Sequence, residues 1–278
     1  MRKKKRFYKV FQYIALLCAL IIIIFPVYWI IVSSFKVKED ILSYPPKIFP
    51  SQFTLSNYIT AFQDYNVLLY LKNSLIVTCA TVILTIIIAA LAAYAMCFLK
   101  MKGARILNNL LYILQVLPTI TMMVPLMTIY RMMGIQNTYL SLILTYTAAV
   151  SGAPIALILI TGYFQAIPQE LFESANIDGA GTFKCFYKIL LPLGAPGMVC
   201  TAIYVFVQTW LEFMFAVNLI TLPEKYTLPV GLQSFVGMRS TDWGGMMATC
   251  TMIAIPAIIL FTMVQNYFVD NLAGSVKE

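Results

Sequence analysis

The sequence predicts an all-α integral membrane protein, and its composition, charge spacing and apolar segments all support this fold class. Hydrophobic residues make up 61% of the 278 residues and charged residues 11%, against roughly 25% charged in a soluble globular domain. The mean hydropathy is +0.84. Residues 73–99 and 243–269 contain no charged side chain. Because a helix crosses the bilayer with about 20 apolar residues, each stretch is long enough for one span.

The apolar segments predict six transmembrane helices. We expect them at about residues 11–32, 73–99, 107–130, 139–163, 197–221 and 246–269. The chain then divides into a basic N-terminus (1–10), a first span (11–32), an external segment (33–71), a core with the other five spans (72–269) and a short tail (270–278). Within the core, a polar loop covers residues 164–196 and a second external segment covers 222–245.

Lysine and arginine predict the orientation of these spans. The stretches "MRKKKR" (1–6) and "KMKGAR" (100–105) are basic and contain no acid, as cytoplasmic segments usually do. Both termini and the 164–196 loop are therefore expected on the cytoplasmic side. The first apolar run, 10–32, exceeds the about 7 to 15 residues of a signal-peptide core and is followed by no A-x-A site. We therefore expect it to remain as a span.

The residue types argue against catalysis, metal binding and nucleic-acid binding by this chain. It has no histidine, which is the commonest general base and metal ligand. Its six cysteines lack ligand spacing and mostly lie in apolar runs, so we expect small core residues. The net charge of +8 fits the basic cytoplasmic segments of a membrane protein. We expect no catalytic residue, metal or cofactor here.

The loop "IPQELFESANIDGAGTFKCFYKILLP" (167–192) is the most polar part of the core. Pro168 suits the first turn of a helix, Glu170 favours its N-terminus, and Gly179 predicts its end after about three turns. Thr182 is expected to cap a second helix that ends at Pro192, near the membrane.

One face of the first predicted helix carries an apolar stripe that ends in an acid. Leu171, Ala175 and Asp178 follow one another at helical spacing. In a cytoplasmic loop, this stripe needs either a protein partner or the underside of the bundle to cover it.

The same loop resembles the EAA loop of bacterial ABC importer permeases. The pattern E-A-A-x-x-D-G-A-x(5)-F-x-x-I-x-L-P-x(3)-P is matched with fixed gaps by Glu173, Ala175, Asp178, Gly179, Ala180, Phe186, Ile189, Leu191, Pro192 and Pro196. Ser174 departs from it, in the place of the second alanine. Serine is also small, so we expect the helix to pack as usual.

Further stretches resemble the carbohydrate-uptake permeases, in particular their MalG-like subunit. These stretches are "SFK" (34–36), "LSNY" (55–58), "IPQEL" (167–171), "WLEFMFA" (210–216), "TLPVGL" (227–232) and "YFVDNLAGSVKE" (267–278). Two features depart from the group: Leu211 stands where asparagine is usual, and the tail is one residue short. They bear on the pore and on the tail contact, not on the family.

The resemblance implies a type I importer transmembrane domain whose polar loop seats in a cleft of a cytoplasmic ATPase. The residues that would form the coupling surface are Leu171, Phe172, Glu173, Ala175, Asp178, Gly179 and Ala180. Leu171, Phe172 and Ala175 would fill the cleft. Glu173 and Asp178 would orient the helix by charged hydrogen bonds, and Gly179 would permit the turn.

The resemblance also implies a set of partners. These are a similar but distinct companion permease, two ATPase subunits and an external solute-binding protein, with membrane lipid around the pair. The chain has no G-x-x-x-x-G-K-[ST] motif, and "GAGTFK" (179–184) lacks its spacing. ATP and Mg²⁺ are therefore expected on the separate ATPase subunits.

Glu212 is an acid inside a predicted span, where an ionisable group is costly. Gln208 and Phe215 lie about one turn away on the same helical face. Two interpretations remain open. In the first, the three residues border a translocation path or contact the companion permease; in the second, Gln208 and a neighbouring helix satisfy a buried acid.

The resemblance to the carbohydrate-uptake permeases implies a permease that moves a sugar, of di- or oligosaccharide size, by ATP-driven alternating access. Glycerol phosphate or another polyol is an alternative substrate. An ion-coupled secondary transporter would need more intramembrane acids than Glu212. A membrane enzyme would need a cluster of His, Asp and Arg at one bilayer face, and the sequence offers none.

Overall fold

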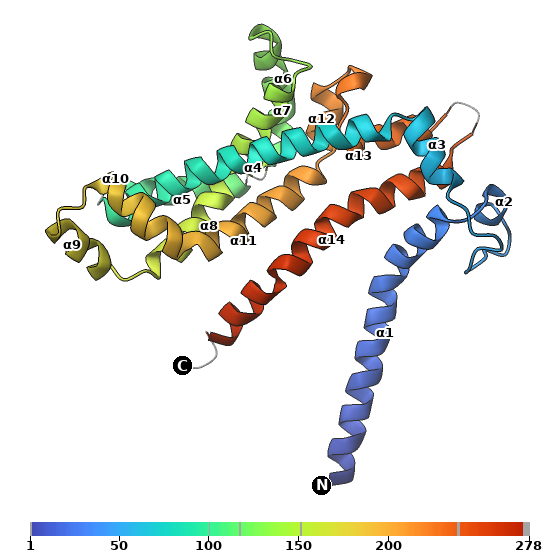
Figure 1. Ribbon diagram of the computed structural model, residues 1–278, viewed down its shortest axis with the longest axis horizontal. Coiled ribbons are helices and arrows are strands. Elements are labelled where there is room, and N and C mark those ends of the chain that lie inside the picture. Colours follow the sequence, from blue (N-terminus) through green and yellow to red (C-terminus); the bar gives the residue numbers. More distant parts are fainter. Residues whose placement is uncertain (1, 100, 117, 151, 238–239, 275–278) are drawn as a thin grey trace. The chain divides into compact units, whose positions relative to one another are not determined.

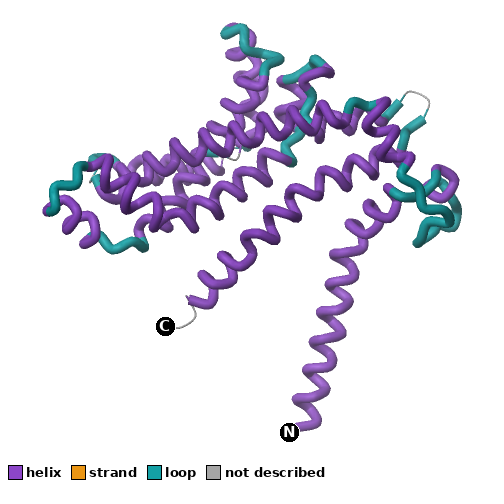
Figure 2. Tube along the Cα trace, viewed as in Figure 1, coloured by secondary structure: helices purple, strands orange, loops and turns teal. Residues whose placement is uncertain are grey.

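The computed structural model describes residues 2–99, 101–116, 118–150, 152–237 and 240–274, and these are largely helical (Figures 1 and 2). An isolated antiparallel bridge joins Val236 to Thr241. The chain divides into two compact units. Unit 1 comprises residues 1–68 and 231–255, and unit 2 comprises residues 69–230 and 256–278. Residues 275–278 of the predicted tail lie outside the described residues.

Unit 1 contains the first apolar helix and the short helices that follow it. Its elements are α1 (Arg2–Ser34), α2 (Lys38–Ile41), α3 (Ser56–Asp64), η5 (Leu232–Phe235) and the first part of α14 (Trp243–Gly274). The Tyr65 ring stacks on Phe235 with 4.1 Å between centroids. Asn57 donates from Nδ2 to the carbonyl oxygens of Ser34 and Lys36 at 2.9 and 2.8 Å. These contacts fasten α3 to the end of α1 and to η5.

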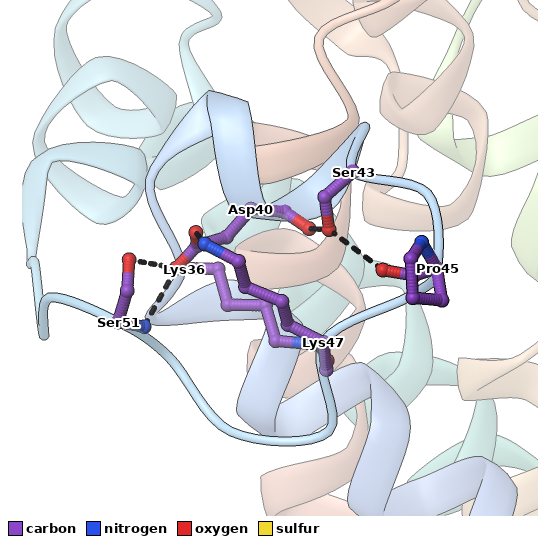
Figure 3. Close-up of polar contacts among 6 residues, drawn as sticks. All are labelled: Lys36, Asp40, Ser43, Pro45, Lys47 and Ser51. Carbon is purple, nitrogen blue, oxygen red and sulfur yellow. Dashed lines mark hydrogen bonds and ion pairs between the residues drawn. The ribbon is translucent and has the colours of Figure 1, made fainter.

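A polar cluster follows α1 in unit 1 (Figure 3). Lys36 is fully buried, and its ammonium donates to the Lys47 carbonyl at 2.6 Å and lies 4.0 Å from the centroid of the Trp29 ring. Asp40 is also buried and accepts hydrogen bonds from Lys47 Nζ and from the Ser51 hydroxyl and amide. These hydrogen bonds lower the pKa of Asp40 to about 2. Burial lowers the pKa of Lys36, partly offset by the charge of Asp40.

Unit 2 is a helical bundle with two clusters of buried apolar residues, one larger than the other. Its elements are α4 (Val67–Phe98, from Leu69 onward), α5 (Ala104–Val116), η1 (Thr119–Met122), α6 (Met123–Met132), α7 (Tyr139–Thr145), the π-helix η2 (Tyr146–Val150), α8 (Ala153–Gln165), α9 (Glu170–Ile177), α10 (Thr182–Cys185), the π-helix η3 (Phe186–Leu190), α11 (Leu191–Trp210), α12 (Met214–Leu219), η4 (Pro223–Lys225) and α14 from Pro256 onward. The short helix α13 (Leu228–Gly231) ends at the boundary with unit 1.

Two apolar cores hold unit 2 together. The larger core joins α4, α5, α8, α9, η3 and α11, with Phe164 and Leu190 fully buried in it. The smaller core joins α4, α6, α7 and α12 around Leu142 and Tyr146. Asn73 on α4 donates from Nδ2 to the Glu224 and Tyr226 carbonyls and accepts from the Tyr139 hydroxyl. The stretch 222–228 is thus fixed to α4 as a cap on the smaller core.

The predicted all-α membrane class is confirmed, with four described helices long and apolar enough to span a bilayer. They are Phe11–Ser34, Val67–Phe98, Thr182–Trp210 and Trp243–Met263. A bent pair, Tyr139–Ala148 with Ala153–Gln165, would make a fifth span; its two parts differ in direction by 47°. Gly152 lies in the bend, where a Cβ would overlap the Thr147 carbonyl oxygen, so the close approach requires glycine.

The predicted third and fifth spans differ from the structure. Residues 107–130 do not form one helix, because the chain is extended at Pro118 (φ −64°, ψ 111°) between α5 and η1. Proline has no N–H and its ring crowds the preceding turn. The predicted span 197–221 is displaced toward the N-terminus, since a continuous helix covers Thr182–Trp210 and a break precedes α12.

Candidate functional site

Helix α9 is a short element whose two ends are set by local sequence. It begins at Glu170, two residues after Pro168, and runs to Ile177, so it has about two turns rather than three. Gly179 adopts φ +78°, and the Ala180 amide donates to the Ala175 carbonyl at 2.9 Å. This is the pattern of a Schellman motif with glycine in the left-handed conformation. The turn after α9 therefore uses the positive φ of Gly179, which is the role predicted for this residue.

Aromatic side chains attach α9 to the bundle at the end of α4. Phe172 is 5% exposed, and its ring lies 4.0 Å from Phe98 and 6.4 Å from Tyr94, centroid to centroid. The Tyr94 ring also contacts Phe186 at 5.2 Å, and its hydroxyl donates to the Thr182 carbonyl at 2.9 Å. Tyr94 therefore contacts both helices of the polar loop.

This packing corrects the predicted role of Phe172. We expected its side chain to fill a cleft in a partner, but it is buried against α4 in this chain. Ala175 and Ala180 are half-buried at the edge of the same core. The underside of the bundle thus covers part of the predicted stripe, and Phe172 anchors α9.

The opposite face of α9 is open. The side chains of Leu171, Glu173 and Asp178 are exposed, and Ile177 is 86% exposed. Among the described residues, no hydrogen bond or ion pair to the carboxylates of Glu173 or Asp178 occurs. The exposed surface of the loop therefore combines apolar tips with acids that have no partner among the described residues. It lies next to an open hollow of about 560 Å³ that Phe98, Phe164 and Glu170 help to line.

The second helix of the loop continues into the membrane. We expected Thr182 to cap it and Pro192 to end it. Instead Gly181 is the N-cap without a side-chain bond, and helical structure continues from Thr182 to Trp210. Pro192 falls in the first turn of α11, where its missing N–H costs little. Helical structure therefore connects Thr182 to Trp210 without a break, through the π-helix η3.

Glu212 lies at a break between α11 and α12. Its carboxylate accepts from the Tyr146 hydroxyl at 2.6 Å, from the Phe215 amide at 2.7 Å and from the Ala216 amide at 3.1 Å. The two amides belong to the first turn of α12, where backbone N–H groups lack partners within the helix. The acid lies one residue before the N-cap Phe213 and caps α12 from there, by accepting two amides of its first turn.

The predicted grouping of Gln208, Glu212 and Phe215 on one helical face is wrong, because the helix ends at Trp210. Gln208 is exposed, and Phe215 is buried in the smaller core. Among the described residues Glu212 accepts no hydrogen bond from Gln208. The second interpretation expected hydrogen bonds from Gln208 and a neighbouring helix to satisfy the acid. Hydrogen bonds do satisfy it, but they come from Tyr146 and from the backbone of α12.

Comparison with known proteins decides the family. Residues 83–273 match the family described as "Binding-protein-dependent transport system inner membrane component". This chain belongs to that family. It is therefore a membrane-embedded permease subunit of an ABC transporter, as the EAA-like loop predicts.

Curated relatives resemble this permease over nearly its whole length. It is 39% identical over 260 residues to the probable ABC transporter permease protein YurM of Bacillus subtilis, covering 93% of this chain and 85% of the relative. It is 34% identical to the sulfoquinovosyl glycerol transport system permease protein SmoH of Agrobacterium fabrum, covering 97% and 94%. The identity to the trehalose/maltose transport system permease protein MalG of Thermococcus litoralis is 35%, covering 92% of each chain.

A solved structure shares the fold of this permease. A chain of a bacterial ABC transporter involved in the import of the acidic polysaccharide alginate superposes with a TM-score of 0.84 at 20% identity, covering 95% of this chain and 98% of that chain. The type I importer architecture predicted from the sequence is confirmed by this likeness.

Sequence reasoning missed the residues that position the site. Tyr94 and Phe98 lie in an apolar run of α4, and Tyr146 lies in another apolar stretch. A buried tyrosine usually finds a hydrogen-bond partner, which is a weak signal, but the partner itself depends on which helices meet. The sequence therefore indicated Glu212 and Phe172 without their contacts.

Proposed function

We propose that this chain is the permease subunit of an ATP-driven importer that moves a sugar, of di- or oligosaccharide size, into a bacterial cell. The support is that relatives at 32–35% identity over more than nine-tenths of the chain are named as permeases for trehalose/maltose, diacetylchitobiose and sulfoquinovosyl glycerol. Each of these is a sugar or a glycoside. Both termini and the loop 164–196 face the cytoplasm in this proposal.

The observation that carries the coupling mechanism is the open face of α9. Its acids have no partner among the described residues, whereas a buried aromatic cluster fixes the helix from behind. Carboxylates on a rigid, exposed helix suit charged hydrogen bonds to a protein partner. We assign that partner as a cytoplasmic ATPase subunit, which would bind ATP and Mg²⁺.

The proposed complex contains two ATPase subunits, a companion permease and an external solute-binding protein. Closure of the ATPases would move α9 and α10, and the unbroken helix Thr182–Trp210 would carry this movement into the bundle. Opening toward the external side would then admit the sugar by alternating access. No covalent step occurs in this chain.

The test uses a pair of glycines with opposite backbone requirements. Gly179 has φ +78°, which proline cannot adopt, whereas Gly181 has φ −67°, which proline prefers. In vesicles holding the complete importer, Gly179→Pro should abolish uptake of labelled sugar and leave ATP hydrolysis unresponsive to the loaded binding protein. Gly181→Pro should keep both near normal. Normal coupled uptake in Gly179→Pro would overturn the coupling role, and uptake without ATP would overturn the importer class.

A further inference from the structure

Residues 43–53 of unit 1, "SYPPKIFPSQF", form a loop that folds back along α1; we name it the proline loop. The Tyr28 hydroxyl donates to the Ile48 carbonyl at 2.9 Å, and the Tyr28 and Phe49 rings meet edge to face at 6.3 Å. Tyr28 lies six residues before the end of α1 at Ser34. At about 1.5 Å per residue, this contact is about 9 Å back along the helix.

The contact places the loop beside the apolar span. The apolar part of α1, Phe11–Ser34, has 24 residues and a length of about 36 Å, against about 30 Å for the hydrocarbon core of a bilayer. If the middle of the span lies at the middle of the bilayer, Tyr28 lies about 6 Å inside the boundary between headgroups and acyl chains. Its side chain points toward the helix N-terminus and therefore further into the bilayer. Phe25, Tyr28 and Trp29 form a ring cluster at this depth, as in the aromatic belt of a membrane interface.

The backbone of the proline loop suits such a site. Pro45, Pro46 and Pro50 have no N–H group to desolvate, and exposed backbone donors are costly near lipid. The Lys47 carbonyl accepts from Lys36 and the Ile48 carbonyl from Tyr28. The one cation of the loop, Lys47, forms an ion pair with Asp40 at 2.6 Å (Figure 3).

The outward side chains are apolar and uncovered within this chain. Tyr44 is 97% exposed, Phe49 is 70% exposed and Ile48 is 58% exposed. Because these side chains lie alongside an apolar span and not beyond its end, we expect lipid rather than water to surround them. We infer that the proline loop inserts into the boundary between headgroups and acyl chains in the leaflet where α1 ends, and that it anchors the external helices of unit 1 to the membrane surface.

The test measures the depth of one added tryptophan in the full chain, reconstituted in phosphatidylcholine vesicles. Phe49→Trp is compared with Phe62→Trp, which adds the same ring on exposed α3. In each case the quenching of the parent chain is subtracted. Lipids brominated near the top of the acyl chain should quench the tryptophan added at position 49 about threefold more than the one added at position 62, because interfacial aromatic rings lie at that depth. Acrylamide in the water should quench in the opposite order.

Two outcomes would overturn the inference. Strong acrylamide quenching at position 49 would place the loop in water. Shielding from both quenchers would show a protein contact, such as a second copy of this chain.

A second variant tests whether the added tryptophan itself causes insertion. Adding Ile48→Asp to Phe49→Trp should reduce the bromolipid quenching by about half or more, because a charge at the boundary opposes insertion. Unchanged quenching would also count against the loop as an anchor.

Discussion

Four acids of this permease form two pairs that differ in how their charge is satisfied. Glu212 accepts three hydrogen bonds, and Asp40 accepts three, one of which is also its ion pair with Lys47; all come from within the chain. Glu173 and Asp178 on α9 are exposed, and no partner for either carboxylate lies among the described residues. The first group stabilises local structure; the second is available to another protein.

This difference assigns Glu212 and Asp40 to the stability of the chain itself, and Glu173 and Asp178 to the binding of a partner. A buried carboxylate without partners would cost several kcal/mol (about 3 to 5), so the buried Asp40 requires the groups that surround it. Glu212 is half-buried, but the hydroxyl and the amides that it accepts from need its acceptor atoms. Exposed carboxylates carry no such cost. Four substitutions or conditions test this division, from the largest expected effect to the smallest.

Removal of the Glu212 carboxylate should have the largest effect. Glu212→Ala leaves the Tyr146 hydroxyl and the amides of Phe215 and Ala216 without their acceptor. We expect a loss of about 3 to 5 kcal/mol in unfolding free energy, because a buried hydroxyl loses its partner and a helix loses its N-terminal acceptor. Denaturant titration in detergent measures this loss. Glu224→Ala, which removes an exposed acid, serves as the control. A similar small change in both variants would contradict the capping role.

Loss of the ring that holds α9 comes next. Phe172→Ala removes the contacts with Phe98 and Tyr94 and should destabilise the chain by about 3 kcal/mol. Hydrogen exchange of the α9 amides should speed up as the helix detaches. Phe183→Ala, at a position 73% exposed, should change neither quantity appreciably. Equal exchange in the two variants would show that Phe172 does not anchor α9.

Acid should loosen the cluster around Asp40 within a defined pH range. Its pKa is lowered from 3.8 to about 2 by hydrogen bonds from Lys47 and Ser51. The folded state therefore binds this proton less readily than the unfolded state. Its contribution to stability is fully present above about pH 4 and is lost as the pH falls toward 2.

The Trp29 environment provides the measurement, because the Lys36 ammonium lies over its ring. The fluorescence of the chain should change between about pH 4 and pH 2. The same change should be absent in Asp40→Asn, which cannot ionise at this position. An identical acid transition in both proteins would assign it to another group.

Neutralising the acids of α9 should have the smallest effect on stability. Glu173→Gln and Asp178→Asn should each change the unfolding free energy by less than about 0.5 kcal/mol. Co-purification of the ATPase should nevertheless fall, since the charged hydrogen bonds across the interface are lost. Full ATPase retention by the double variant would move the coupling contact away from these acids.

Part of the site follows from the sequence because the signals are local. The position of Gly179 at the end of α9 is set by the backbone freedom of one residue type. The polar loop 164–196 stands out because its charges lie between apolar runs. By contrast, residues 211–213, where α11 and α12 are separated, contain no glycine or proline that would predict a break. It depends on Glu212, whose acceptor atoms cap α12 only when the chain turns there.

The sequence by itself determined the membrane class, the EAA-like loop and the family, because hydropathy and motif spacing act along the chain and need no knowledge of packing. Tertiary structure alone decided that Phe172 faces inward, that Tyr146 meets Glu212 and that the proline loop lies beside Tyr28. Each of these contacts joins segments 20 to 74 residues apart. Side chains so distant meet only after the helices have packed, and the helices pack through apolar surfaces whose partners hydropathy does not distinguish.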